Sequence, residues 1–198
     1  MATPALTSGA HEGGGHDVAV SPRRIGLLGG ESTGKTTLAK ALADQLPGIV
    51  AEEYLRDFVR DYGRVPALAD QEGIYLIQQM RVNRAMSAAV HEQVAWVIAD
   101  PVPLMTAVYS VAYFDDDSLL AGGIADASTY DVLLWCAPDI EWSPDGDQRD
   151  GPEHRDRADR IISDIVAPAL VKAGAPELHR ISGSADERLR CSHVITAD

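Results

Sequence analysis

The sequence is poor in positive charge and especially in lysine. Its 198 residues include 17 lysines and arginines against 30 aspartates and glutamates, a formal net charge of −13 at pH 7. Only Lys35, Lys40 and Lys172 are lysines. General nucleic-acid binding and polybasic membrane binding both need clustered positive charge facing phosphates. We therefore expect neither nucleic acid nor a membrane as a partner, and an anionic ligand must be held by a few local cations.

Cysteines and long apolar runs are also scarce. No apolar run approaches the roughly 18 residues of a membrane span, and we find no secretory leader, so we expect a cytoplasmic protein. Cys136 and Cys191 belong to no pair or cluster with metal-ligand spacing. We expect both thiols to be buried and reduced.

The composition is that of one globular unit. An apolar content of 45% is ordinary, and the length suffices for one domain with a sizeable core. Residues 1–22 mix glycine, serine, alanine, proline and histidine without periodicity, which predicts a flexible tail. We expect residues 23–198 to form a single domain. The sequence carries no signal for oligomeric state, and a homo-oligomer stays open.

The most informative feature is a match to the phosphate-binding template, two glycines separated by four residues and followed by Lys and Ser or Thr. Small residues let backbone N–H groups turn inward around phosphates, and the following helix adds the positive end of its dipole. We expect Lys35 to reach the β- and γ-phosphates of a nucleotide and Thr36 to ligate Mg²⁺, while the motif leaves ATP and GTP open. The expected nucleotide contacts are Gly29, Gly30, Glu31, Ser32, Thr33, Gly34, Lys35, Thr36 and Thr37.

The pattern around this loop predicts an α/β fold. Residues 24–28 form an apolar run typical of a buried strand, and residues 35–46 carry leucines at four-residue spacing, as an amphipathic helix does. Further strands are predicted at 48–51, 96–99, 131–136 and 177–181, and further helices over 52–62, over 68–92 and after Pro103. Alternating strands and helices predict a parallel sheet of about five strands flanked by helices, as in the P-loop NTPase fold. Ligands bind such sheets at the carboxyl ends of the strands.

Acidic residues follow two of these strands. Asp100 ends the third strand, where it could support Mg²⁺ or cap the next helix. Pro101 occupies the position where hydrolytic motors often carry a water-activating glutamate, which favours a transferase. Glu53 follows the second strand and could accept a proton from a substrate hydroxyl, although Glu52, Glu53 and Arg56 also fit a solvated helix face.

Residues 142–157 combine turn residues, alternating charge and three arginines between a predicted strand and a predicted helix. A mobile lid of this composition would stabilise a transferred phosphoryl group and exclude water. The same segment fits a solvated loop whose arginines pair with neighbouring aspartates.

Several of these strings together resemble the ribosylnicotinamide kinase domain of the bifunctional regulators of NAD biosynthesis. The strings are the loop, Glu53-Tyr54-x-Arg56, the Pro-Leu-Met-Thr stretch at 103–106, and Trp142 with Asp145-Gly146 and Arg149. The similarity extends from residue 25 to the C-terminus. Members of this family use ATP to phosphorylate the 5′-hydroxyl of nicotinamide riboside, giving nicotinamide mononucleotide. The resemblance implies a kinase-like fold with a mobile lid and a small nucleoside substrate.

The resemblance also implies site residues. The catalytic set would be Lys35, Glu53, Asp100 and Arg149, and Mg²⁺ would be held by Thr36 and Asp100. The nucleoside would contact Glu53, Tyr54, Arg56, Trp142 and Asp145. Gly183 lies in a stretch, 182–188, that resembles the loop placed beside adenine. A helix start capped by Ser184 with Glu187 three residues later explains this stretch equally well.

One departure from the family pattern keeps other functions open. The family usually has Asp-Thr-Asp before Pro-Leu-Met-Thr, whereas Asp100-Pro101-Val102 keeps only the first carboxylate. Glu31 and Glu53 could compensate for the missing acid. The alternatives are a kinase for another nucleoside or nucleotide, a nucleotide-dependent switch that binds a protein partner, and a degenerate kinase fold without catalysis.

Overall fold

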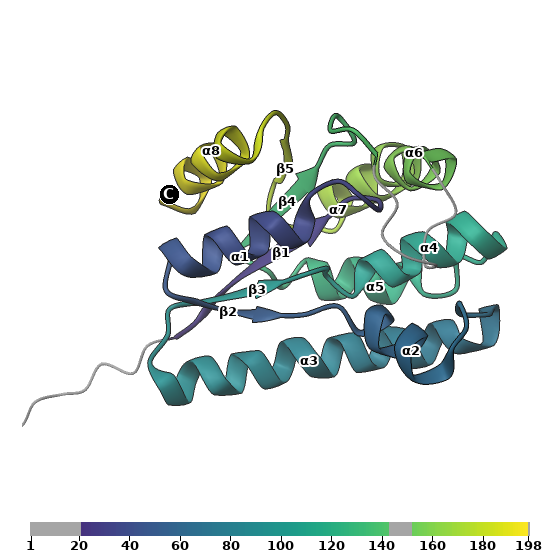
Figure 1. Cartoon of the computed structure of the whole chain (residues 1–198), viewed down its shortest axis with the longest axis horizontal. Helices are drawn as coiled ribbons and strands as arrows, with labels where there is room; N and C mark the ends of the chain where they lie inside the picture. Colours follow the sequence, from purple (N-terminus) through teal and green to yellow (C-terminus); the bar gives the residue numbers. More distant parts are fainter. Residues whose placement is uncertain (1–20, 143–151, 198) are drawn as a thin grey trace, which may run out of the picture.

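The fold is built around one parallel sheet. The computed structural model describes residues 21–142 and 152–197, so most of the predicted tail and the lid residues Asp145 and Arg149 lie outside the described residues. Five parallel strands occur in the order β2-β3-β1-β4-β5 (Figure 1). They are β1 Arg23–Leu28, β2 Gly48–Ala51, β3 Trp96–Ala99, β4 Val132–Cys136 and β5 Leu178–Ile181.

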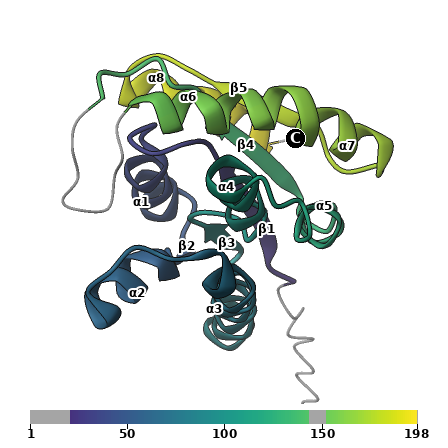
Figure 2. The ribbon, with the colours of Figure 1, turned by 90° about the vertical axis from the view of Figure 1, so that its right-hand side faces the viewer.

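The strands are apolar on both faces because both faces are covered. Successive strand residues point to opposite sides of a sheet, so Ile25 and Leu27 enter one core while Leu28 enters the other. The first core lies under α1 (Lys35–Gln45) and α8 (Ala185–Ala197), and the second under helices that include α3 (Gln71–Glu92) and α4 (Leu104–Phe114). Figure 2 places α1 on one side of the sheet and α5 (Leu120–Ala127) on the other.

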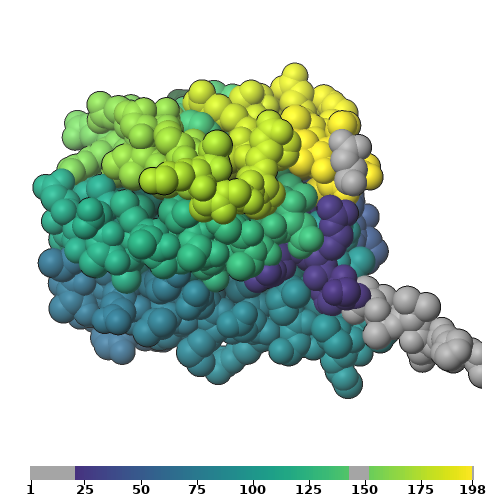
Figure 3. All heavy atoms as spheres, turned by 180° about the vertical axis from the view of Figure 1, so that it is seen from behind, coloured from purple at the N-terminus to yellow at the C-terminus, as the bar shows by residue number. Residues whose placement is uncertain are grey.

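The remaining helices extend the second layer. Figure 3 shows the chain of α4 and α5 between blue α3 below and yellow-green α6 and α7 above. A 3₁₀ turn, Leu68–Asp70, precedes α3, and a π-helical stretch, Ile162–Val166, joins α6 to α7. The bounds are α2 Tyr54–Tyr62, α5 Leu120–Ala127, α6 Pro152–Ile161 and α7 Ala167–Lys172.

The five predicted strands and the parallel topology are confirmed. Three expectations need correction or completion. The sequence analysis assigned no element to 120–127, which is α5. Residues 152–157 of the predicted lid loop are the first turns of α6, with Pro152 at the helix start, where its missing N–H costs nothing. Cys136 is buried as expected, but Cys191 is exposed, because it lies on the solvent side of α8.

None of the helices in the described part of the chain has both the length and the apolar character needed to cross a membrane. The division into a tail and a single domain over residues 23–198 stays a prediction.

A partly buried carboxylate lies between α3 and α5. The side-chain amide of Gln79 donates to Asp126 Oδ1 at 3.1 Å, and Asp126 Oδ2 is buried without a hydrogen-bond partner among the described residues. Burial raises the pKa of the Asp126 carboxyl, while the Gln79 hydrogen bond and the charge of Arg24 oppose the rise. The ionised carboxylate is therefore poorly stabilised at neutral pH.

Asp126→Asn should stabilise the protein at pH 7. Because the native pKa is raised, the folded state binds more protons than the unfolded state, and wild-type stability falls as pH rises from about 4 through the raised pKa. We expect the variant to gain on the order of 1 kcal/mol or less at pH 7 and nothing below about pH 4. Urea unfolding at both pH values measures this, with exposed Asp164→Asn as control. Equal stability of D126N and wild type at pH 7 would contradict it.

Candidate active site

The loop between β1 and α1 has the shape that its glycines permit. Gly29 has φ 136°, and a Cβ there would lie 2.7 Å from the Cys136 carbonyl oxygen in β4. Gly34 has φ 79° and occupies the N-cap of α1, so no side chain caps this helix. The first backbone N–H groups of α1 are therefore open toward the loop, which is the arrangement that binds an anion.

Lys35 lies across the loop. Its ammonium donates to the carbonyl oxygens of Gly29 at 2.9 Å and Gly30 at 2.7 Å, and the Thr33 hydroxyl also donates to Gly30 at 2.8 Å. These bonds hold a positive charge where phosphates would enter. Ser32, Thr36 and Thr37 lie in the same loop and helix start.

Asp100 lies close to this loop at the end of β3. It is buried, and its backbone N–H donates to the Ala51 carbonyl of β2 at 3.0 Å. Burial raises the pKa of the Cys136 thiol to about 11, while Lys35 lowers this pKa and Asp100 raises it. Lys35 and Asp100 thus both act on the thiol at the carboxyl end of β4, although β1 lies between β3 and β4, and Cys136 itself stays a neutral thiol.

A cavity of about 230 Å³ opens beside the loop, under α2 and between α3 and α4. Glu31 and Glu53, which lie 22 positions apart in the sequence, both line it. Its other described walls are mostly apolar or aromatic, with amide and hydroxyl groups between them, and none of the described lining residues is Lys, Arg or His. They are Leu55, Val59, Val65, Pro66, Gln71, Ile74, Gln78, Pro101, Thr106, Tyr109, Tyr113 and Phe114. We refer to this space as the acceptor cavity.

Two further predicted substrate residues, Tyr54 and Arg56, lie in α2 beside this cavity, but neither belongs to its described lining. Arg56 forms an ion pair with Glu53, with 3.3 Å between Nε and Oε2. Tyr54 starts α2, and its backbone N–H donates to Gln78 Oε1 at 2.8 Å. The Gln78 amide also donates to the Pro101 carbonyl at 3.1 Å. Gln78 thus ties the start of α2 to the turn after Asp100.

The start of α6 covers the loop and the edge of the acceptor cavity. A Cβ on Gly30 would lie 3.0 Å from the Arg155 carbonyl oxygen and 3.1 Å from its Cα, and Arg155 Nη1 donates to the Ile140 carbonyl at 3.0 Å. His154 stacks on Tyr113, with ring centroids 4.7 Å apart. Arg155 is thus the described lid arginine that lies against the loop.

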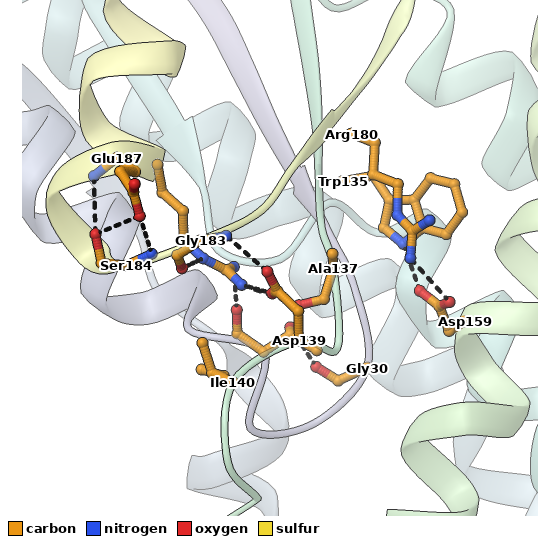
Figure 4. Close-up of polar contacts among 12 residues, drawn as sticks. Gly30, Trp135, Ala137, Asp139, Ile140, Asp159, Arg180, Gly183, Ser184 and Glu187 are labelled. Carbon is orange, nitrogen blue, oxygen red and sulfur yellow. Dashed lines mark hydrogen bonds and ion pairs between the residues drawn. The ribbon is translucent and has the colours of Figure 1, made fainter.

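Further along α6, an anchor joins this helix to the sheet. Trp135 Nε1 in β4 donates to Asp159 Oδ1 at 2.9 Å, and Arg180 in β5 stacks on the Trp135 ring and pairs with Asp159 Oδ2 at 3.7 Å (Figure 4). Trp142 is half-buried, and its indole N–H has no hydrogen-bond partner among the described residues.

A second cavity, also of about 230 Å³, lies on the other side of the loop. Gly183 lies in the turn beside it, with Ser184 capping α8. The Ser184 backbone N–H donates to Glu187 Oε2 at 2.8 Å, and the Glu187 backbone N–H donates to Ser184 Oγ at 3.4 Å, so the predicted capping box is confirmed. We refer to this second cavity as the base-side cavity. The described residues that line it are Gly34, Thr37, Leu38, Ala41, Ile140, Ala185 and Arg188.

The described residues hold no cluster of three or more His, Cys, Asp or Glu side chains arranged around a metal ion. A magnesium ion needs no such cluster, because it commonly uses one or two protein ligands together with phosphates and water. The Thr36 hydroxyl and the Asp100 carboxylate are donors of the hard type that Mg²⁺ prefers, and they fit this requirement.

With this geometry in place, the chain can be compared with known proteins. A family model described as an AAA domain matches residues 24–188. The chain belongs to this AAA domain family. No curated protein sequence matches this AAA domain.

Solved structures share the fold of this AAA domain at low sequence identity. NadR protein in complex with NR has a TM-score of 0.70 and 20% identity, over 89% of this chain and 50% of that chain. NadR protein in complex with NAD and AMP-PNP has a TM-score of 0.69 and 19% sequence identity, over 90% of this chain and 50% of that chain. Thymidylate kinase from Candida albicans has a TM-score of 0.64 and 13% sequence identity, over 89% of this chain and 92% of that chain. The chain thus spans half the length of the NadR chains, and its fold is that of P-loop kinases.

Four further residues lie at the site: the sequence analysis did not name Gln78 or Tyr113, and it covered Arg155 and Arg188 only as members of the segments 142–157 and 182–188. Gln78 is a buried polar residue at four-residue spacing between Ile74 and Val82, and this spacing is a usable signal. Tyr113 carries no comparable local signal, because it reaches the site through α4, whereas Arg155 belongs to the predicted lid segment and reaches the site through α6. Arg188 lies on α8, far along the chain from the loop that it contacts.

Val102, at the position of the family's second acid, faces the core. It is fully buried, and a Cβ on Gly26 would lie 2.3 Å from Val102 Cγ1. It is absent from the lining of the acceptor cavity, whereas Glu31 and Glu53 both belong to it.

Val102→Asp should therefore destabilise the protein without increasing any activity. A buried carboxylate without a partner costs about 3 kcal/mol or more. Val102→Thr has nearly the same shape and should cost about 1–2 kcal/mol for its hydroxyl group. Denaturant unfolding of both variants checks the order. A V102D protein as stable as wild type would show that this position is not core.

Proposed function

We propose that this protein is an ATP-dependent phosphotransferase that acts on the hydroxyl group of a small metabolite, most specifically the 5′-hydroxyl of nicotinamide riboside. The phosphate loop, the P-loop kinase fold and the AAA domain family support the transferase class. The acceptor cavity beside the loop supports the nucleoside class. A cytoplasmic setting with access to ATP is part of the proposal.

The proposed place of ATP follows from the two sides of the loop. The open N–H groups of α1 and the Lys35 ammonium would hold the β- and γ-phosphates. The base-side cavity, bordered by Thr37 and Ala185, would take the base. Thr36 and Asp100 would hold Mg²⁺, which would neutralise part of the phosphate charge.

The charge of the acceptor cavity carries the choice of substrate class. Among the described residues that line it, the charged ones are Glu31 and Glu53, both acidic, and none is basic. A phosphate group in this space would lie beside like charges, which is unfavourable. A neutral or positively charged acceptor avoids this cost, so a nucleoside fits better than a nucleoside monophosphate.

Nicotinamide riboside matches the cavity in two further respects. Its pyridinium ring carries a positive charge, which carboxylates attract, and aromatic side chains such as Tyr109 and Tyr113 favour a cation near their faces. The solved NadR complex with NR belongs to a protein with the same fold. This likeness supports the proposal together with the resemblance carried by Glu53-Tyr54-x-Arg56.

The proposed reaction is a direct transfer. The acceptor hydroxyl oxygen attacks the γ-phosphorus, the bond to the ADP oxygen breaks, and the hydroxyl proton passes to a carboxylate. Glu53 lines the acceptor cavity, and its ion pair with Arg56 orients its carboxylate, so we assign the proton to Glu53. The start of α6 would exclude water from the loop.

The deciding experiment measures Mg-ATP consumption with and without nicotinamide riboside, with mass spectrometry for nicotinamide mononucleotide. Product should form in wild type and fall by roughly two to three orders of magnitude in Lys35→Ala, since that variant loses the charge on the phosphates. Lys40→Ala on the exposed side of α1 is the matched control and should keep its activity.

A panel of other nucleosides and of nucleoside monophosphates completes this experiment. Transfer to another nucleoside would change the acceptor but keep the enzyme class. No transfer to any member would overturn the proposal, and hydrolysis without acceptor that a protein partner stimulates would favour a nucleotide-dependent switch.

Glu53→Gln should lower kcat by about 100-fold or more while the KM for ATP changes by less than about twofold, because the variant loses only the proton acceptor. Glu52→Gln is the neighbouring control, since Glu52 is exposed and absent from the cavity lining. Steady-state kinetics with both substrates measures the two effects. If Asp100→Asn alone abolishes turnover while ATP still binds, the proton acceptor is Asp100 instead.

A further inference from the structure

Arg188 is a buried cation at the end of the 182–188 stretch, and the sequence analysis gave it no role of its own. It lies in α8 and is 3% exposed. Its guanidinium donates to three backbone carbonyls, with Nε to Gly183 at 2.8 Å, Nη1 to Thr33 at 2.8 Å and Nη2 to Ala137 at 3.1 Å. It also forms an ion pair with Asp139.

These contacts join three segments that are distant in the sequence. Thr33 belongs to the phosphate loop, Ala137 and Asp139 follow β4, and Gly183 lies in the turn between β5 and α8. Asp139 completes the link, because its Oδ2 accepts from the Gly183 backbone N–H at 2.6 Å. Gly183 is thus held through its carbonyl by Arg188 and through its N–H by Asp139, as Figure 4 shows for Asp139.

The joined segments enclose the base-side cavity. Gly34 and Thr37 line it from the phosphate loop and α1, Ile140 from the segment after β4, and Ala185 from the start of α8. Arg188 lines it as well, but its guanidinium is already bonded to protein groups on all three sides. An arginine with its planar donors committed in this way fixes geometry rather than binding a further ligand.

We propose that Arg188 and Asp139 are positioning residues for the nucleotide, with Arg188 holding the phosphate loop and the base-side turn in one arrangement. This inference rests on the proposed function, because it requires that the protein binds a nucleoside triphosphate. Arg188 is bonded to the phosphate side through the Thr33 carbonyl and to the base side through the Gly183 carbonyl. Asp139 binds the base side directly, through the Gly183 N–H, and is linked to the phosphate side only through its ion pair with Arg188.

Two ligands distinguish the phosphate-side contact from the base-side contact: Mg-ATP, which has a base, and inorganic tripolyphosphate with Mg²⁺, which has none. Calorimetry measures the affinity for each. Asp139→Asn keeps the Thr33 bond but loses the charge-assisted contact to Gly183. Its Kd for ATP should rise about tenfold, and its Kd for tripolyphosphate should stay within about twofold of wild type. Arg188→Met loses the hydrogen bonds to both Thr33 and Gly183, so both dissociation constants should rise by more than about tenfold.

Arg180→Met is the matched control. Arg180 also pairs with an aspartate and lies in β5, the strand that precedes α8. Its partners, Asp159 and Trp135, form a cluster separate from the contacts of Asp139 and Gly183 (Figure 4). It should bind both ligands as wild type does. In steady-state assays, the KM for ATP should rise in the Asp139 and Arg188 variants, while the acceptor KM and kcat at saturating ATP stay within about threefold.

The outcomes separate the two proposals. If wild type binds neither ligand, both the function and this inference are overturned. If wild type binds ATP and folded Asp139→Asn binds it equally well, Arg188 and Asp139 have no positioning role, while the proposed function stands. An equal loss of both ligands in Asp139→Asn would also overturn the inference, because a general structural effect predicts that result. If Arg188→Met does not fold, the Asp139→Asn result alone decides.

Discussion

The close approach of Gly29 to β4 is the contact on which the rest of the site depends. A side chain at this position would collide with the Cys136 carbonyl, so only glycine lets the chain leave β1 and turn back into α1 here. The turn ends with Gly34 in a left-handed conformation, which leaves the start of α1 uncapped and lets Lys35 fold over the loop. The acceptor cavity and the base-side cavity then lie on opposite sides of this turn.

Charge is distributed unevenly around that turn, although the whole chain is strongly acidic. Lys35 and Arg188 are bonded to loop carbonyls and Arg155 lies against Gly30, whereas the acceptor cavity contains Glu31 and Glu53. A scarcity of cations makes this arrangement more selective, because phosphate groups meet compensating charge at the loop and unfavourable charge in the cavity. In the proposed function, the same contrast tells the donor from the acceptor.

The sequence predicted the sheet and the loop because both depend on local patterns, apolar runs of strand length and fixed glycine spacing. It placed Glu53 and Asp100 correctly at the carboxyl ends of the strands, since parallel strands all end at the same edge of the sheet. It missed α5, whose central Gly122-Gly123 weakens the helical signal. It could not find Arg188, because the contact with Thr33 joins residues 155 positions apart. The burial of Cys191 was wrong because periodicity does not say which side of α8 meets the sheet.

The Trp135 anchor gives the protein an optical reporter of its own. The indole of Trp135 is fixed in β4, while the carboxylate that it contacts belongs to α6, the helix whose first turn lies over the phosphate loop. Indole emission depends on hydrogen bonding and on contact with water. Any displacement of α6 from the sheet therefore changes the fluorescence spectrum of this tryptophan, without a label and in the native chain.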